Sequence, residues 1–155
     1  MLLKLILLSF IYQTFAATKP CAHTSTSFQC VKHERTYDGD TFTVTIPNIH
    51  PLIGKKVNIR VAGVDTPEIR TKNACEKRKG RRAKRLVENL LSRASRIDLT
   101  NIERDKYFRI VADVSIDGAS LKSYILKNNL GVSYDGGAKS QIDWCKPLRT
   151  ISSKK

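Results

Sequence analysis

Short stretches of the chain alternate between apolar and polar residues, which is the pattern of strands that bury one face. The predicted strands cover residues 28–37, 41–46, 55–64, 96–103 and 108–116. The second is the most regular, because Phe42, Val44 and Ile46 alternate with threonines and should face the core. Asp38-Gly39 is typical of a tight turn, so the first two strands are predicted to form a hairpin.

The third predicted strand ends in a break of its alternation. Arg60 lies on the face opposite to Val61, whereas Val64 follows Val61 after three residues instead of two. One extra residue of this kind predicts a bulge or bend, which we place at Gly63. The bend would bring Arg60 and Asp65 to the same side of the chain.

Helical periodicity replaces alternation at residues 81–94, where apolar residues recur at intervals of three and four. The opposite face of this helix carries Arg81, Arg82, Lys84, Arg85 and Arg93. We interpret these charges as a solvated face rather than a nucleic-acid contact, because the face of a surface helix opposite to its apolar face is usually polar. The preceding residues, 69–80, are predicted to be irregular.

A second, shorter helix is predicted at 120–129, with Leu121, Tyr124 and Ile125 facing inward. Residues 131–137 are glycine-rich and predicted to be extended, and 139–144 could form one helical turn. The order of these elements predicts an α+β fold, an OB-type five-stranded antiparallel β-barrel with two or three packed helices. Such barrels commonly bind oligonucleotides.

Composition limits the chain to one globular unit, since 155 residues with 41% apolar content suffice for a single core. Residues 1–17 have one early lysine, an apolar run and small residues at the end, which predicts a signal peptide. An uncleaved N-terminal anchor is the alternative. We expect a secreted or periplasmic protein with no membrane insertion after signal removal. Residues 18–27 are then a polar tether, 28–148 the OB domain and 149–155 a basic tail.

The charge of the chain points to a polyanionic partner. Removing residues 1–17 takes away only Lys4, which leaves 27 basic and 14 acidic side chains and a net charge of +13. So large an excess attracts nucleic acid, anionic membranes or cell-wall polymers. Charge alone does not choose among these partners.

The cysteines form an even set of four, Cys21, Cys30, Cys75 and Cys145. In an exported chain this number favours two disulfides, which we expect to join Cys21 to Cys30 and Cys75 to Cys145. The alternative is a zinc site made of the first two cysteines with His23 and His33, although the spacings fit no common zinc finger.

The segment 60–68 concentrates polar chemistry after an apolar strand. Pro67 forces a turn that can present Asp65, the Thr66 carbonyl and Glu68 towards one point. Oxygen ligands of this kind suit a hard cation such as Ca²⁺ or Mg²⁺ better than zinc. The alternative is an ordinary proline turn with solvated acids.

Three motifs together resemble a known family. Asp38-Gly39-Asp40-Thr41, Arg60 with residues 65–68, and Asp105-Lys106-Tyr107-Phe108-Arg109 occur in the order found in staphylococcal-nuclease-type thermonucleases. The resemblance runs from about residue 37 to 134. It implies a calcium-dependent, sugar-nonspecific nuclease with DNA and RNA as substrates, which leaves 3′-phosphate ends. For a chain of this size a monomer is the default expectation, and we expect no obligate protein partner.

The resemblance carries three metal ligands and three catalytic residues over to this chain. Asp40, Asp65 and the main-chain carbonyl of Thr66 resemble the ligands of Ca²⁺. Glu68 resembles the general base for the attacking water. Arg60 and Arg109 resemble the arginines that contact the scissile phosphate, and their rigid, permanently charged forks suit that role.

The nucleotide pocket is implied by Lys106, Tyr107 and Tyr134. Phe108 departs from the glycine found between tyrosine and arginine in the best-known member of the family. After Tyr134 the resemblance fades, and we expect a Cys75 to Cys145 bond to tie down the tail in place of a missing terminal helix.

Two other functions compete with the nuclease. One is a catalytically inactive OB-fold protein that binds single-stranded nucleic acid through charge and stacking on Tyr107 or Tyr134. The other is a cationic envelope protein bound to anionic polymers. A pure binder has no need of Asp40, Asp65 and Glu68 near a phosphate, and this feature favours the enzyme.

Overall fold

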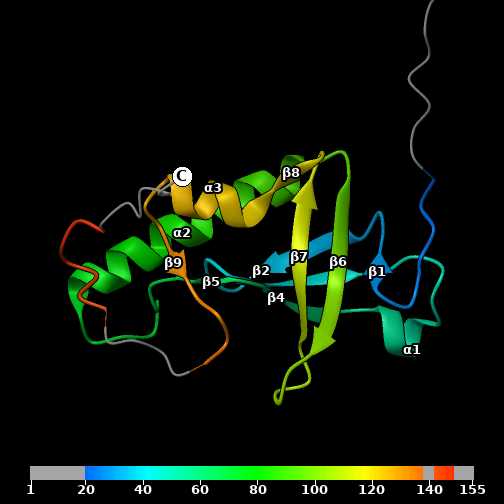
Figure 1. The fold of residues 1–155 in the computed structure, drawn as a ribbon, viewed down its shortest axis with the longest axis horizontal. Coiled ribbons are helices and arrows are strands. Elements are labelled where there is room, and N and C mark those ends of the chain that lie inside the picture. The colour runs from blue at the N-terminus through cyan, green and yellow to red at the C-terminus, as the bar shows by residue number, and fades with distance from the viewer. Residues whose placement is uncertain (1–19, 138–141, 149–155) are drawn as a thin grey trace, which may run out of the picture.

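The computed structural model describes residues 20–137 and 142–148, which form strands and helices of the predicted α+β class (Figure 1). The strands are β1 (Ser27–Phe28), β2 (Lys32–Thr36), β3 (Thr41–Thr45), β4 (Val57–Val61), β5 (Val64–Asp65), β6 (Ile97–Arg104), β7 (Ile110–Ile116), β8 (Ala119–Ser120) and β9 (Val132–Ser133). The helices are α1 (Pro51–Gly54), α2 (Ala74–Arg93) and α3 (Leu121–Lys127). All five predicted strands are therefore present, the first of them divided into β1 and β2.

The main sheet has the order β1-β6-β7-β4-β3-β2, with β8 paired to β7. The prediction that all strands pair antiparallel was wrong for β4 and β7, which run parallel. The chain between β4 and β7 includes α2 and the strand β6. Because β6 and β7 are antiparallel, the chain reverses after β6, and β7 then runs in the same direction as β4. The strand order does not close into a ring, because β1 and β2 at its two ends do not pair with each other. One hydrogen bond nevertheless connects the two ends of the sheet: the N–H of Val31, just before β2, donates to the carbonyl of Ile97 in β6 at 2.9 Å.

The β2–β3 hairpin has the predicted inward face. Phe42, Val44 and Ile46 are buried, and they join a core that also takes residues from β4, β6, β7, α2 and α3. Figure 1 shows α2 and α3 together on one side of the molecule and α1 on the other. The segment between the second and third predicted strands contains the short helix α1.

The predicted bend lies at Gly63, whose φ of 71° requires a left-handed conformation that glycine adopts without steric cost. It separates β4 from β5, and β5 pairs with β9 in a second, two-stranded sheet. Pairing between Val64 and Ser133 holds the chain in its new direction. The extended segment predicted at 131–137 supplies this partner strand.

The helix predicted at 81–94 begins earlier, at Ala74, so the irregular segment predicted for residues 69–80 was wrong over its second half. The Asn73 side chain caps the helix by accepting hydrogen bonds from the backbone N–H groups of Cys75 and Glu76. Asparagine followed three residues later by glutamate is a start signal. Basic side chains fill the first turns and hide the apolar period, which explains the error.

In α3, Leu121 and Ile125 are buried as predicted, but Tyr124 is 37% exposed and does not face inward. Strand β7 begins at Ile110, two residues later than predicted, because Asp105 and Phe108 form a turn. The first half of the helical turn predicted at 139–144, residues 139–141, lies outside the described residues. The predicted signal peptide and basic tail lie outside them as well.

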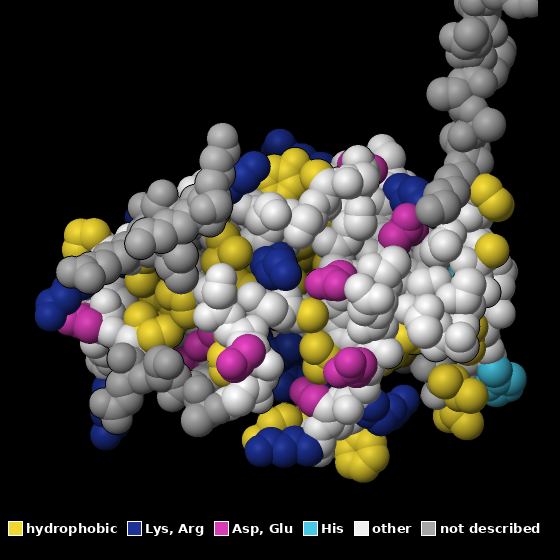
Figure 2. All heavy atoms as spheres, in the orientation of Figure 1, with side chains coloured by type: hydrophobic (Ala, Val, Ile, Leu, Met, Phe, Trp, Pro, Cys, Tyr) yellow, Lys and Arg dark blue, Asp and Glu magenta, His cyan; other side chains and the backbone are white. Residues whose placement is uncertain are grey.

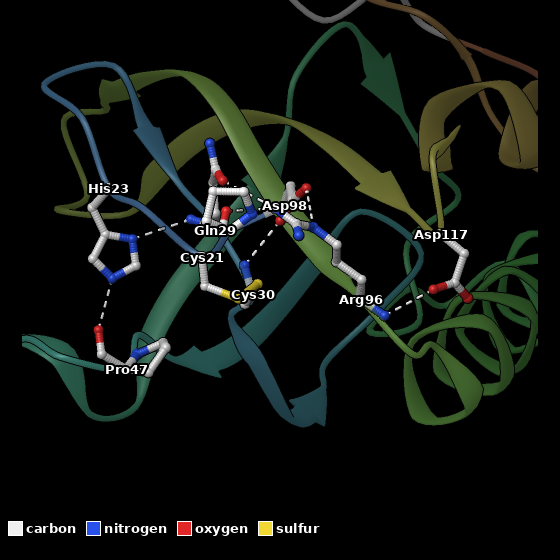
Figure 3. Close-up of a disulfide and its surroundings, with 9 residues drawn as sticks. Cys21, His23, Gln29, Cys30, Pro47, Arg96, Asp98 and Asp117 are labelled. Atoms are coloured by element: carbon white, nitrogen blue, oxygen red, sulfur yellow. Dashed lines mark hydrogen bonds and ion pairs between the residues drawn. A yellow bond between two sulfur atoms is a disulfide. The ribbon is translucent and has the colours of Figure 1, made fainter. Parts of the chain in front are cut away.

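The N-terminal segment is tied to the sheet by the predicted Cys21–Cys30 disulfide (Figure 3). Its backbone is fixed further, because the Cys30 N–H donates to the Asp98 carboxylate at 2.9 Å. His23 Nε2 donates to the Pro47 carbonyl at 2.7 Å, and His23 Nδ1 accepts from Gln29. The zinc alternative was therefore wrong, since its cysteines are bonded to each other.

The second predicted disulfide is absent, because Cys75 and Cys145 carry free thiols. The tail nevertheless lies against the start of α2. The Cys75 thiol donates to the Trp144 carbonyl at 3.9 Å, and the Cys145 thiol donates to the Asn73 side chain at 3.5 Å. Trp144 is buried, so packing anchors this part of the tail.

Helix α2 lies close to the segment after β5 at Gly80. A Cβ atom there would lie 2.6 Å from the Pro67 carbonyl oxygen. On an open helix surface, Gly→Ala raises stability by about 1 kcal/mol. We expect Gly80→Ala to lower the free energy of unfolding instead, by about 1–3 kcal/mol, because the helix must shift from Pro67.

Urea unfolding of Gly80→Ala measures this effect. Ser92→Ala, a change at an exposed position of the same helix, is the matched control and should have little effect. A Gly80→Ala variant more stable than the wild type would show that the contact is not tight.

Candidate active site

Asp40 is held by the hairpin turn before β3 and is only 4% exposed. One oxygen, Oδ2, accepts hydrogen bonds from the Thr66 N–H at 3.0 Å and the Thr66 hydroxyl at 2.9 Å. The other, Oδ1, accepts the Thr41 hydroxyl at 3.0 Å and pairs with Arg60. These bonds fasten the β2–β3 turn to the segment after β5, which lies 26 residues further along the chain.

Arg60 joins the two buried aspartates. One guanidinium nitrogen pairs with Asp40, and the other lies 3.2 Å from Asp65 Oδ1 and 3.2 Å from the Val64 carbonyl. Burial alone would lower the pKa of Arg60, but the carboxylates of Asp40 and Asp65 raise it above its ordinary value. Arg60 and Asp65 thus lie on one side, as the bend at Gly63 predicts.

A small cavity of about 90 Å³ opens next to this ion-pair cluster. Its walls are Asp38, Asp40, Thr41, Arg60, Thr66, Glu68 and Arg109. Five of the residues predicted for metal binding and catalysis therefore meet around one space, although they come from three distant parts of the chain. Asp65 is not among the walls, and reaches the cluster through Arg60.

Glu68 follows the proline turn and is exposed, in contrast to the two buried aspartates. Its backbone N–H donates to the Glu76 carboxylate at 3.2 Å, in the first turn of α2. The helix therefore fixes the main chain of Glu68, while the side chain borders the cavity.

Arg109 is positioned by Asp105, four residues earlier. Asp105 Oδ2 accepts from Arg109 Nε at 2.8 Å, and Oδ1 accepts from the backbone N–H groups of Tyr107 and Arg109. Although partial burial acts to raise the pKa of Asp105, these hydrogen bonds lower it below its ordinary value. The carboxylate holds both the turn and the guanidinium, and our sequence analysis assigned it no role.

A larger groove of about 810 Å³ adjoins the cavity and shares Arg60 and Arg109 with it. Lys106, Tyr107 and Tyr134 line this groove, as predicted for a nucleotide pocket. The Arg109 guanidinium lies 5.4 Å from the Tyr107 ring centre, and the Arg60 guanidinium lies 5.9 Å from that of Tyr134. Figure 2 shows a hollow below the centre of the molecule, with basic side chains between acidic ones.

Asp38 is a further acid of the site that sequence analysis interpreted only as a turn residue. Its Oδ1 accepts from the backbone N–H groups of Asp40 and Thr41. Burial and the neighbouring Asp40 carboxylate raise its pKa to about 6. The signal was available, since the Asp-Gly-Asp motif places two carboxylates two residues apart.

The described residues contain no ready-made group of three or more His, Cys, Asp or Glu side chains arranged to hold a metal ion. Their chemistry nevertheless fits a hard cation. Four carboxylates, those of Asp38, Asp40, Asp65 and Glu68, lie around the half-buried Arg60. Burial and, after it, the neighbouring Asp40 carboxylate raise the pKa of Asp38. A cation bound there must share Asp40 with Arg60.

Comparison with known proteins identifies the family. Residues 58–144 match the family described as staphylococcal nuclease homologue. The chain belongs to this family. The OB-type fold and the suspected resemblance are thereby confirmed, and Arg60, Asp65, Glu68 and Arg109 lie within the matched residues, whereas Asp40 precedes them.

Two curated relatives of this nuclease-family chain come from Bacillus subtilis (strain 168). Endonuclease YncB is 36% identical over 100 residues, and the SPbeta prophage-derived endonuclease YokF is 32% identical over 100 residues. Each alignment covers 63% of this chain, but only 44% of YncB and 31% of YokF. The chain thus matches less than half the length of either relative.

Phe108 is the clearest departure in the nuclease motifs. It has a φ of 61° and its side chain is 80% exposed, at the tip of the turn between β6 and β7. A left-handed conformation is costly for a bulky residue. The glycine that the resemblance places here therefore suits the backbone, whereas Phe108 adds an exposed ring beside Tyr107.

The raised pKa of Asp38 predicts how the metal-free protein responds to pH. A carboxyl group with a pKa near 6 in the folded state and near 3.8 in the unfolded state holds its proton more tightly when folded. Its contribution to stability is therefore present at low pH and is lost as the pH rises through 4 to 6. Asp38→Asn keeps the oxygen acceptor but cannot ionise.

We expect the free energy of unfolding of Asp38→Asn, relative to the wild type, to rise between pH 4 and pH 7 by more than about 1 kcal/mol. Chemical unfolding with a chelator present measures the difference at each pH. Asp135→Asn, at an exposed aspartate, is the control and should show no such rise. A difference independent of pH would contradict the assignment.

Proposed function

We propose that this protein is a nuclease that hydrolyses phosphodiester bonds of DNA and RNA with Ca²⁺. The observation that carries the proposal is the shared cavity, in which two arginines face an acid-rich wall. Family membership and two relatives named as endonucleases support it. We further propose that cleavage leaves 3′-phosphate ends and that the protein acts as a monomer, in the secreted or periplasmic compartment.

Arg60 and Arg109 would receive the scissile phosphate between the cavity and the groove. Both guanidinium groups are already held by aspartates, Arg60 by Asp40 and Asp65, and Arg109 by Asp105. A donor fixed before substrate binding stabilises developing negative charge without reorganisation. The carboxylates orient the forks and leave both arginines positively charged.

Glu68 is the best placed general base among the carboxylates of the cavity. Asp40 has both oxygens engaged by Thr41, Thr66 and Arg60. Asp38 Oδ1 accepts hydrogen bonds from the backbone N–H groups of Asp40 and Thr41, and the buried Asp65 does not line the cavity. Glu68 is exposed on the cavity wall, so it can accept a proton from water and pass it to solvent.

Asp40, Asp65 and the Thr66 carbonyl would hold the cation. When bound, Ca²⁺ would polarise the phosphate and lower the pKa of nearby water. The protein's own part is to fix these oxygens, through the Thr66 bonds to Asp40 and the Arg60 bridge to Asp65. Excess negative charge in this cluster favours cation binding.

The groove lined by Tyr107 and Tyr134 would take the bases next to the scissile phosphate, since aromatic rings stack on any base. This tolerance agrees with a nuclease that acts on both DNA and RNA. The competing proposal is an inactive OB-fold protein that binds single strands through the same groove. Nothing in that function uses the acids of the cavity.

The test is to incubate the purified protein with plasmid DNA and with RNA, in Ca²⁺ and in chelator. We expect cleavage of both substrates in Ca²⁺ only. Glu68→Gln and Arg109→Ala should each reduce turnover by about 100-fold or more while the protein stays folded. Glu34→Gln, at an exposed glutamate of β2, is the control and should retain full activity.

Absence of cleavage by the wild type with any divalent cation would refute the nuclease, and retained gel shifts would then support the binder. Near-normal turnover of the Glu68 or Arg109 variant would remove only the role of that residue. End-labelling of the products distinguishes 3′-phosphate from 5′-phosphate ends.

A further inference from the structure

Helix α2 has a second face that the proposed active site does not use. Its inner face, made of Gly80, Ala83, Val87 and Leu91, is buried against the rest of the molecule. Its outer face carries five exposed arginines, Arg78, Arg81, Arg82, Arg85 and Arg93. They follow helical spacing and form one stripe, here called the arginine stripe, about 22 Å long.

The arginine stripe is not neutralised by the protein. No ion pair or hydrogen bond joins any of its five arginines to another residue in the part of the chain that the structure describes. Like charges three or four residues apart destabilise a helix by about 0.2–0.5 kcal/mol per pair. A face that is merely solvated usually mixes both signs, whereas this face has a single acid, Glu88.

The same helix borders both turns that carry the acids of the cavity. Gly80 packs on the Pro67 and Glu68 backbone, and a Cβ atom on Gly39 would lie 2.6 Å from the Ala83 side chain. The arginine stripe is thus fixed rigidly relative to the cavity, on the opposite side of one helix. A polynucleotide longer than the groove could reach it.

We propose that the arginine stripe is a second nucleic-acid site, which binds the sugar–phosphate backbone of the polynucleotide outside the catalytic groove. The inference rests on the proposed nucleic-acid substrate. All five side chains are arginine, whose fork matches phosphate oxygens in pairs. One charge per about 1.7 Å of duplex gives the stripe several phosphates to contact.

An anionic membrane is the other polyanion that could bind basic residues. Helices that lie on membranes insert an apolar face into the bilayer surface. The apolar face of α2 is instead buried in the core, and the exposed residues of its outer face are arginines, Glu88, Asn89, Ser92 and the terminal Ala74. The composition of the stripe therefore favours a nucleic-acid backbone.

The test compares two triple variants that remove the same charge. The stripe variant combines Arg78→Gln, Arg82→Gln and Arg85→Gln, which removes three of the five arginines of the arginine stripe. Lys55→Gln with Lys56→Gln and Lys127→Gln removes three exposed lysines elsewhere. Affinity for a 30-base-pair duplex is measured in chelator from 50 to 300 mM salt, together with Ca²⁺-dependent turnover of a short dinucleotide substrate and with binding to phosphatidylglycerol vesicles.

We expect the stripe variant to flatten the slope of log affinity against log salt by about 2–3, which corresponds to the loss of three phosphate contacts. The lysine variant should change the slope by less than 1. Dinucleotide turnover should be unaffected in both, because the groove is intact. Thermal unfolding should be unchanged or slightly raised in the stripe variant, because like charges have been removed.

Equal slopes in the two variants would overturn the proposal, because the stripe would then act only through net charge. Loss of vesicle binding with unchanged duplex binding would overturn it in favour of a membrane contact. A wild-type protein that cleaves nothing, but shows the expected difference in slopes, would refute the nuclease and leave the second site standing.

Discussion

The ion pairs of Arg60 are the interaction on which the site depends. Asp40 and Asp65 are almost fully buried, and a buried carboxylate without a partner is strongly destabilising. Arg60 offers one nitrogen to each, and this is possible only because the chain bends at Gly63 and brings Asp65 back beside β4. The strand, the bend and the hairpin turn are therefore coupled by one side chain.

The second constraint is mechanical and comes from α2. Gly80 of the helix packs closely against the Pro67 carbonyl. The Glu76 carboxylate of the same helix accepts a hydrogen bond from the Glu68 N–H. The turn that carries Glu68 is consequently held between the Arg60 cluster and the helix. This double support explains how the segment 60–68 can present several polar groups although residues 66–68 lie outside the strands.

Much of this arrangement was predictable from local sequence patterns. The alternation of apolar and polar residues predicted the strands, because a strand that buries one face places every second residue in the core. The interruption of this alternation between Val61 and Val64 predicted the bend. The motifs identified two of the three acids and both arginines that line the cavity, because their order along the chain is specific. The Cys21–Cys30 pairing was also predicted, because an even set of four cysteines in an exported chain favours two disulfides.

The errors concern features that depend on distant contacts or on weaker local signals. The parallel pairing of β4 with β7 is set by the whole connection between them, not by either strand. The start of α2 was hidden by basic residues, although Asn73 and Glu76 marked it. The roles of Asp38 and Asp105 depend on which groups fold against them.

The most direct test of the central claim is the turnover of Arg60→Lys on plasmid DNA in Ca²⁺. Lysine keeps the charge, so it can still compensate the buried carboxylates, but it lacks the fork that bridges Asp40 and Asp65 while facing a phosphate. The account predicts a folded protein whose turnover falls by about 100-fold or more. A folded Arg60→Lys variant with wild-type turnover would contradict it.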